Sequence, residues 1–277
     1  METVTRTIYA AHLSTCKLLN KPFTLLPNST LNQKFNVFPS ELPTINQYPS
    51  LAYIGIGNKG ANYEMSTNGY ILTTPIPKLP RFASLFNFIP FIIREENNDL
   101  PAAQRQLYRM RVPMTIDGTN YFAYYLRVLD LTTTTPSVEL RNVNNGVITT
   151  TNFTPDISDL NPTPPVISNP NLNNPNGDYL ASSAIVNFKL DMQDIQEIMT
   201  ACDIIYGDPR FAVINEIALC SGIDRVLPGQ IGSTTVNYTE SIATQVCAFI
   251  NQYHALTSNT TGVNITFDIG SVEPLLV

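Results

Sequence analysis

Side chains that carry out chemistry are scarce in this chain. Its 277 residues include 2 His, 4 Cys and no Trp, and only 14% of them are charged. Enzymes that use acid–base, nucleophilic or metal chemistry concentrate His, Cys, Asp, Glu or Lys at one place. The sequence shows no such concentration. It therefore predicts a protein that is not an enzyme, with no catalytic, cofactor-binding or metal-binding residues and no cofactor.

Long apolar runs and an excess of positive charge are also missing. The longest apolar run, 82–93, is broken by Pro90 and is too short to span a bilayer. The opening residues are amphipathic and do not resemble a secretion signal. A net charge of -6 disfavours nonspecific binding to nucleic acid or anionic lipid. We therefore expect a soluble protein made in the cytoplasm, with neither nucleic acid nor a membrane as a partner.

The few thiols and imidazoles do not form a recognisable reactive pair. The four cysteines form no CxxC pair or similar cluster: Cys16, Cys202, Cys220 and Cys247. Three of them lie in apolar runs, where a free thiol behaves as a small core residue, so structural thiols are predicted, with a disulfide as the alternative. His12 and His254 are far apart in the sequence and GxSxG is absent. No nucleophile–base pair is predicted.

Amide and hydroxyl side chains stand in place of charge. The chain has 28 Asn, 30 Thr and 16 Ser, together with 21 Pro. Proline and asparagine concentrate in residues 21–50 and 151–178, a composition that does not suit a central strand or a long helix. Long segments without regular structure are usually functional or linkers. We interpret 21–50 as an extended segment and 151–178 as an arm or connector between domains.

The first 150 residues are predicted to form a β-rich domain with antiparallel hairpins. Residues 1–20 fit either a short helix or a strand followed by a helix, and Leu51–Gly57 is strand-like. A short basic helix is expected at 102–109, after a proline suited to a first helical turn.

Two hairpins are predicted from turn signals at Asp117-Gly118 and at Asn144-Asn145-Gly146. Their four strands are expected at 112–116, 120–131, 137–143 and 147–151.

Residues 179–277 are predicted to form a β-α-β-α-β module, which makes the whole chain α+β. Asp191 and Gly207 are suited to cap the first helix, whose apolar residues recur at helical spacing. A second helix is expected at 239–254. The strands are expected at 184–190, 211–222 and 263–270. Three parts result: 1–150, the arm 151–178, and 179–277.

One motif suggests nucleotide binding. Gly55, Gly57 and Gly60 match GxGxxG and follow a strand. A dinucleotide site requires a helix to begin at these glycines, and the next residues are unsuited to one. We therefore favour a tight turn that needs positive φ at glycine.

Charged clusters suggest cation or anion binding, and each has a simpler explanation. Asp191, Asp194 and Glu197 share one helix face, and we expect a solvated, capped helix start there. The acidic run Glu95, Glu96 and Asp99 lies near the basic residues Arg94, Arg105, Arg109 and Arg111. Divalent-ion and phosphate contacts are the alternatives to salt bridges within the chain or to a neighbouring subunit.

An Asn/Thr/Pro-rich chain with little charge is typical of virion proteins, which associate through arms and strand edges. Several stretches resemble structural proteins of contractile-tailed phages, in particular baseplate wedge proteins. These stretches are TRTIYAAHLSTC, YPSLAYIGIGN, DGTNYFAYYLRVLDL, YTESIATQVC and VEPLLV. Wedge proteins follow the strand glycine with Pro-Trp, whereas Asn58, Lys59 and Gly60 stand here. A neck, collar or tail-terminator position therefore stays open beside the baseplate.

The resemblance implies a structural component of a tailed-phage virion, assembled in the host cytoplasm in multiple copies in the baseplate or tail. Its partners would be other virion proteins and copies of itself. A neck or head-tail connector component is one alternative. A carbohydrate-binding, adhesin-like module is another, since 13 Tyr and many Asn are suitable sugar contacts.

The arm hypothesis makes a prediction. Deletion of Asp156–Asn176 should leave a folded protein that fails to assemble, because this segment contributes contacts and no core. Circular dichroism checks the fold, and electron microscopy of particles checks assembly. Normal particles without the segment would contradict the hypothesis.

Overall fold

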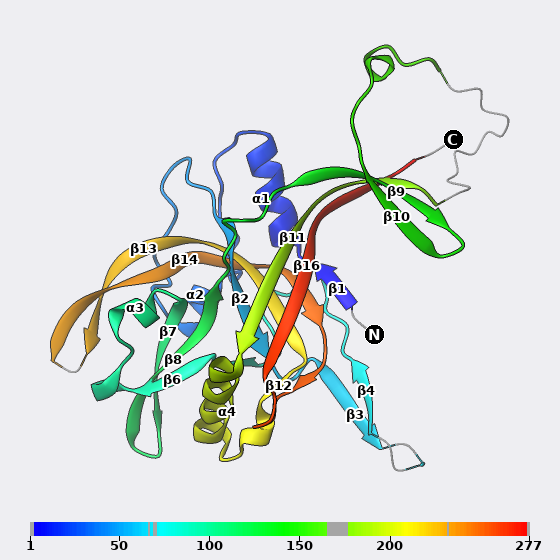
Figure 1. Ribbon diagram of the computed structural model, residues 1–277. Coiled ribbons are helices and arrows are strands. Elements are labelled where there is room, and N and C mark those ends of the chain that lie inside the picture. Colours follow the sequence, from blue (N-terminus) through cyan, green and yellow to red (C-terminus); the bar gives the residue numbers. More distant parts are fainter. Residues whose placement is uncertain (1–2, 66, 69–70, 165–176, 232, 276–277) are drawn as a thin grey trace. The chain divides into compact units, whose positions relative to one another are not determined.

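Antiparallel strands predominate in the computed structural model, which describes residues 3–65, 67–68, 71–164, 177–231 and 233–275 (Figure 1). This confirms a β-rich α+β chain. The elements are β1 (Thr3–Arg6), α1 (Ile8–Leu18), α2 (Leu31–Phe35), β2 (Ser50–Gly57), β3 (Ala61–Met65), β4 (Ile71–Pro75), β5 (Phe88–Ile89), β6 (Ile92–Glu95), α3 (Ala102–Arg105), β7 (Tyr108–Ile116), β8 (Thr119–Val128), β9 (Ser137–Asn144), β10 (Val147–Asn152), β11 (Tyr179–Asp191), α4 (Met192–Tyr206), β12 (Val213–Ile214), β13 (Glu216–Ile231), β14 (Thr234–Asn251), β15 (His254–Ala255) and β16 (Gly262–Pro274).

The chain forms two compact units, each made of two separate stretches. Unit 1 comprises Met1–Leu129 and Leu190–Val263, and unit 2 comprises Asp130–Lys189 and Asn264–Val277. This division differs from the expected one at 151–178, because the strands of 190–263 pair with the N-terminal strands. Residues 165–176 of the expected arm lie outside the described residues.

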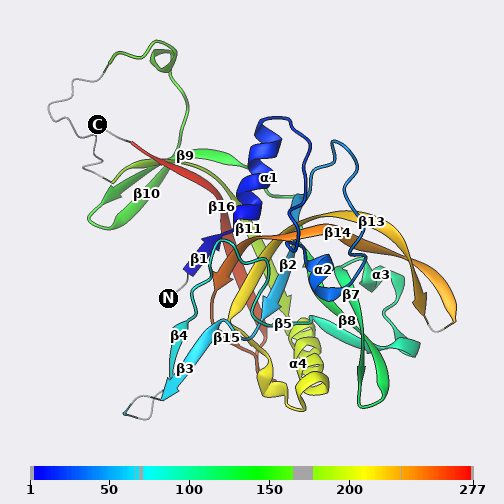
Figure 2. The ribbon, with the colours of Figure 1, turned by 180° about the vertical axis from the view of Figure 1, so that it is seen from behind.

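Unit 1 is built around one large antiparallel sheet. Its strand order is β1-β14-β13-β2-β8-β6, with β5 also paired to β2 and β7 to β8. Helices α1 and α2 contact β14, while α4 contacts β5 and β6 (Figure 2). The order places distant segments side by side, so that Glu216 of β13 pairs with Gly57 of β2.

Both predicted hairpin turns are confirmed. Asp117 and Gly118 have φ of 49° and 80°, and Asn145 and Gly146 have 49° and 81°. Two consecutive positive φ values define the turn that matches the twist of a hairpin. β7 pairs with β8 across the first turn, and β9 pairs with β10 across the second.

The ends of α4 also match the sequence. The Asp191 carboxylate accepts a hydrogen bond from the Asp194 backbone N at 2.9 Å, and the Asp194 carboxylate accepts one from the Asp191 backbone N at 3.0 Å. Gly207 ends the helix with φ of 71°. This reciprocal arrangement is a capping box.

The helix expected at 239–254 is wrong, because these residues belong mainly to β14. The apolar spacing that suggested a helix arises from a strand buried on both faces, where alternation is lost. A bulge at Ala243, with φ of 52°, shifts the alternation further. The β-α-β-α-β order is therefore wrong as well. The helix expected at 102–109 ends at Arg105, since Tyr108 already pairs with Arg127 in the sheet.

The opening residues form β1 followed by α1, which is one of the two alternatives predicted. The Pro-rich segment 21–50 contains one short helix, α2, and otherwise lacks regular elements apart from the first residue of β2.

Helix α2 fastens this segment to the bulge in β14. The buried Asn32 Nδ2 donates to Val37 O at 2.9 Å and to Ser241 O at 2.8 Å, and Asn32 Oδ1 accepts from Thr244 N at 3.0 Å. The amide therefore satisfies backbone groups that the bulge removes from strand pairing.

Asn32→Asp tests this link. The substitution places a buried carboxylate oxygen against two carbonyl oxygens, which should lower the free energy of unfolding by roughly 3 kcal/mol. Asn46→Asp, at an exposed position, is the matched control and should change it little. Urea denaturation measures both variants. Equal stability of the two would show that Asn32 does not hold the bulge.

Candidate functional site

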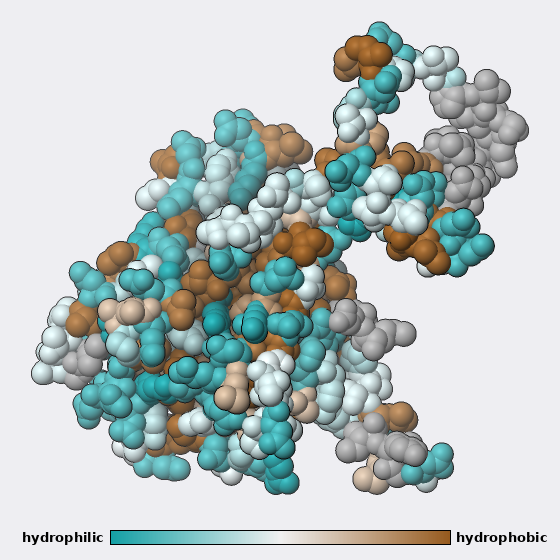
Figure 3. Space-filling model, in the orientation of Figure 1, coloured by the Kyte–Doolittle hydropathy of each residue, from teal (hydrophilic) through white to brown (hydrophobic). Residues whose placement is uncertain are grey.

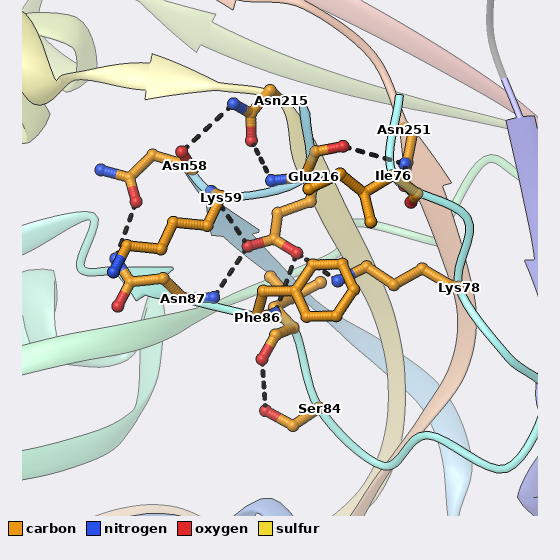
Figure 4. A network of polar contacts seen from close by, with 12 residues as sticks. Asn58, Lys59, Ile76, Lys78, Ser84, Phe86, Asn87, Asn215, Glu216 and Asn251 are labelled. Carbon is orange, nitrogen blue, oxygen red and sulfur yellow. Dashed lines mark hydrogen bonds and ion pairs between the residues drawn. The ribbon is translucent and has the colours of Figure 1, made fainter. Parts of the chain in front are cut away.

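A buried ion pair joins three segments of unit 1 (Figure 4). Glu216, at the start of β13, pairs with Lys78, and both side chains are excluded from solvent. Glu216 Oε2 accepts from the Phe86 backbone N at 3.0 Å, and Oε1 accepts from the backbone N of Asn87 at 2.9 Å and of Lys59 at 3.3 Å. Both carboxylate oxygens of Glu216 are therefore occupied by groups of this chain.

Lys78, the partner of Glu216, also contacts an aromatic ring. The Lys78 Nζ lies 3.1 Å from the centroid of the Phe86 ring. Burial lowers the pKa of the Lys78 amine below its usual value, while the hydrogen bond and the charge of Glu216 act against that shift. A buried charge needs such compensation, so the pair acts as one structural unit.

Two buried amides extend this network to the turn after β2 (Figure 4). Asn215 Oδ1 accepts from Gly60 N at 2.7 Å, and its Nδ2 donates to Asn58 O at 3.2 Å. Asn251 Nδ2 donates to Gly60 O at 3.2 Å and to Ile76 O at 2.8 Å. The turn is thus fixed by Asn215, which directly precedes β13, and by Asn251 of β14, both distant in sequence.

The GxGxxG residues serve close packing, and the predicted positive φ is wrong. None of Gly55, Gly57 and Gly60 is among the described glycines with positive φ. A Cβ at Gly57 would lie 2.3 Å from Asn87 O, and one at Gly60 would lie 2.6 Å from Asn215 O. The motif is followed by the strand β3, so the turn lacks the helix that a dinucleotide requires.

A hollow of about 300 Å³ lies beside this turn. Its lining comprises Gly60, Ala61, Thr73, Pro75, Asn215, Asn251, Gln252, Tyr253 and His254. The side chains of Asn215 and Asn251 on its wall already bind backbone groups of the turn. These two amides therefore hold the fold at this hollow.

Asp191, Asp194 and Glu197 are not all solvated as expected. Asp194 and Glu197 contact arginines of the main sheet. Glu197 accepts from Arg94 of β6 at 2.7 and 2.5 Å, and Asp194 lies 2.5 Å from Arg127 of β8. The Glu197 hydrogen bond raises the pKa of Arg94 above its usual value. Asp191 alone of the three is exposed, at the cap.

Salt bridges within the chain use the acidic run and the basic cluster. Asp99 lies 3.0 Å from Arg111 and accepts from Tyr124 Oη at 2.8 Å. Arg109 donates to Asp224 at 2.8 and 2.6 Å. Glu96 accepts from Asn120, and the Arg105 guanidinium lies over the Tyr238 ring, 4.7 Å from its centroid. Glu95 is exposed on β6.

A second buried carboxylate stabilises a strained residue in β7. Met110 has φ of 58° and is not paired with β8, although the register is the same on either side of it. Its backbone N donates to Glu240 Oε2 at 2.9 Å, and the Arg111 N does so at 3.3 Å. Burial raises the pKa of Glu240 to about 7, while these hydrogen bonds and the charges of Arg111 and Arg109 act against it.

Of the thiols and imidazoles, Cys16 and His12 lie in contact on α1. All four cysteines are free thiols, as predicted, and Cys247 is the one that is not fully buried. His12 lies one turn before Cys16 on α1, with Nε2 3.7 Å from the sulfur, and also contacts Thr24 O. His254 contacts Gln252. Among the described residues, no group of three or more His, Cys, Asp or Glu could hold a metal ion.

Unit 2 presents a different kind of surface. Its sheet has the order β10-β9-β11-β16, and β10 forms one edge. Every residue of β10 is exposed, including Val147 at 63% and Ile148 at 54%. Figure 3 shows hydrophobic residues on the surface of the β9–β10 hairpin. The buried apolar residues of unit 2 lie on β11 and β16: Ala181, Val186, Phe188, Ile265 and Phe267. We call residues 147–153 the β10 edge and treat it as the candidate functional surface.

The fold and these surfaces define a two-unit, antiparallel β-rich protein whose buried charges are structural. The chain belongs to a family of unknown function, DUF7208, whose model matches residues 1–277. No curated protein and no solved structure matches the chain. Across the described residues, none of the helices has the length and apolar character needed to cross a membrane.

The raised pKa of Glu240 predicts that the free energy of unfolding depends on pH. Between pH 4.5 and about 7 the unfolded chain loses this proton while the folded protein keeps it, so stability falls as pH rises. Glu240→Gln keeps an acceptor and removes the titration. Its stability relative to wild type should therefore rise by up to roughly 3 kcal/mol across this window.

Urea denaturation at a series of pH values measures the effect. Glu64→Gln, on the exposed strand β3, is the control and should show a constant difference from wild type. A constant difference for Glu240→Gln would contradict the assignment.

Proposed function

We propose that this chain is a structural, non-enzymatic component of a tailed-phage virion, assembled in multiple copies in the baseplate or tail. Its partners are copies of itself and other virion proteins. The observation that supports this most directly is the β10 edge, an exposed and uncharged strand at the border of a sheet. Such edges are templates for pairing with another chain.

The use of charged side chains in unit 1 supports the same proposal. The carboxylates that suggested acid–base or cation chemistry, at Asp99, Asp194 and Glu197, bind arginines or tyrosine of the same unit. Glu216 and Glu240 bind backbone amides. These contacts give a rigid body, which suits a part that must keep its shape within a particle.

Most of the stretches that resemble phage tail proteins lie in unit 1. They include part of β1, β2, β8 and the central part of β14, which belong to the main sheet of unit 1, and α1, which contacts β14. The resemblance therefore concerns strands of one sheet, in which β13 separates β14 from β2. Of the five stretches, VEPLLV lies wholly in unit 2.

Particle composition tests the proposal. Particles produced by the genome that encodes this chain are purified by density gradient, and their proteins are quantified by mass spectrometry. We expect the chain in several copies per particle, and a gold-labelled antibody should mark the tail or baseplate. Label at the neck would support the connector alternative. Absence of the chain from purified particles would refute the virion proposal.

A further inference from the structure

Among the described residues, the backbone of β10 has a defined set of N–H and C=O groups that pair with no other strand. The two-residue turn makes Asn144 and Val147 a hydrogen-bonded pair, so the backbone groups of every second residue from Val147 onward point to β9. The bond from Phe153 N to Val138 O, at 3.0 Å, agrees with this alternation. The N–H and C=O groups of Ile148, Thr150 and Asn152 therefore point away from β9, toward the open side of the edge.

The β10 edge lacks the features that usually prevent pairing with another chain. Natural edges are protected by lysine, proline, inward charges or bulges. No charged residue occurs from Asn142 through Pro155, and β10 itself contains valine, isoleucine and threonine without proline or glycine. The strand at the other end of the sheet, β16, carries Asp268, Glu273 and Pro274. Of the two edge strands, β10 is the unprotected one.

We propose that β10 pairs antiparallel with β10 of a second copy of this chain, about a two-fold axis at Thr150. This inference rests on the proposed function in that it names a contact for self-assembly. The two four-stranded sheets then form one continuous sheet. A two-fold contact of this kind uses the same patch on both copies and closes on itself.

The register follows from the outward groups. Outward residues must face outward residues, so Thr150 lies opposite its own counterpart and Ile148 lies opposite Asn152. This register uses the whole edge and places Val147 opposite Phe153 of the second copy, once at each end. The two Val147–Phe153 pairs, in which Val147 is exposed and Phe153 half-exposed, thus flank the central threonines. Apolar cross-strand pairs of this kind stabilise a sheet.

The absence of charge favours a second copy as the occupant. A charged partner strand would find no complementary group on the β10 edge. An identical strand meets no like charge at any position, and its backbone groups match by symmetry.

Charge substitution at Thr150 tests the two-fold register. Thr150→Lys places two ammonium groups directly opposite each other, and Thr150→Glu does the same with carboxylates. Each variant alone should dimerise about tenfold or more weakly than wild type, because like charges directly opposite are destabilising. An equimolar mixture should regain dimers, since lysine then faces glutamate. Sedimentation across a concentration series measures all three samples and wild type.

Two further variants separate pairing from folding. Thr150→Pro removes an outward N–H and leaves the bonds to β9 intact, so it should weaken the dimer and keep the circular dichroism spectrum. Thr163→Lys, at an exposed position outside the strands, is the control and should dimerise like wild type.

A monomeric wild type, or dimers insensitive to Thr150→Lys and Thr150→Pro, would overturn the inference. Weakening by both charges without recovery in the mixture would also overturn it, because the strands would then not meet at Thr150. These results are independent of particle composition. The chain can be present in particles without this contact, or form this dimer and be absent from particles.

Discussion

The main sheet of unit 1 depends on isolated buried polar side chains that satisfy backbone groups where strand pairing is interrupted. Glu240 accepts from the backbone N of Met110, which has a positive φ and is not paired with β8. Asn32 accepts from the bulge in β14, and Glu216 accepts from the loop at Phe86 and Asn87. A buried backbone amide without a partner costs about as much as a lost hydrogen bond. These three side chains therefore allow the sheet to contain irregular residues and tight loops. Without them, the backbone groups at these positions would be buried without a partner.

This constraint explains which parts of the fold were predictable. Local signals determine the turns at Asp117-Gly118 and Asn145-Gly146 and both caps of α4, and these predictions are confirmed. The bulge at Ala243 depends on α2, which lies far away in the sequence. By shifting the alternation of apolar residues, it made the β14 sequence resemble a helix. Burial on both faces removed the alternation that would have indicated a strand.

The buried carboxylates were beyond sequence reasoning for a related reason. Glu216 interrupts the apolar run 211–222, and this single charge is the signal that could have marked it. Its partner Lys78 is 138 residues away, and no spacing rule connects them. The β10 edge was different, since its uncharged β-branched composition is visible in the sequence, although its position at a border follows only from the sheet order.

The arrangement of unit 2 along the chain has a consequence for synthesis. Three of its strands precede the 190–263 portion of unit 1, and the fourth, β16, follows it. While the chain emerges from the ribosome, β9 and β10 can form a hairpin, but a lone hairpin is only marginally stable in water. The sheet that presents the β10 edge is complete only after β16 has been made. Neighbouring nascent chains on one messenger RNA therefore lack a stable β10 edge, and the order of translation would delay the proposed β10 pairing until unit 1 has been synthesised.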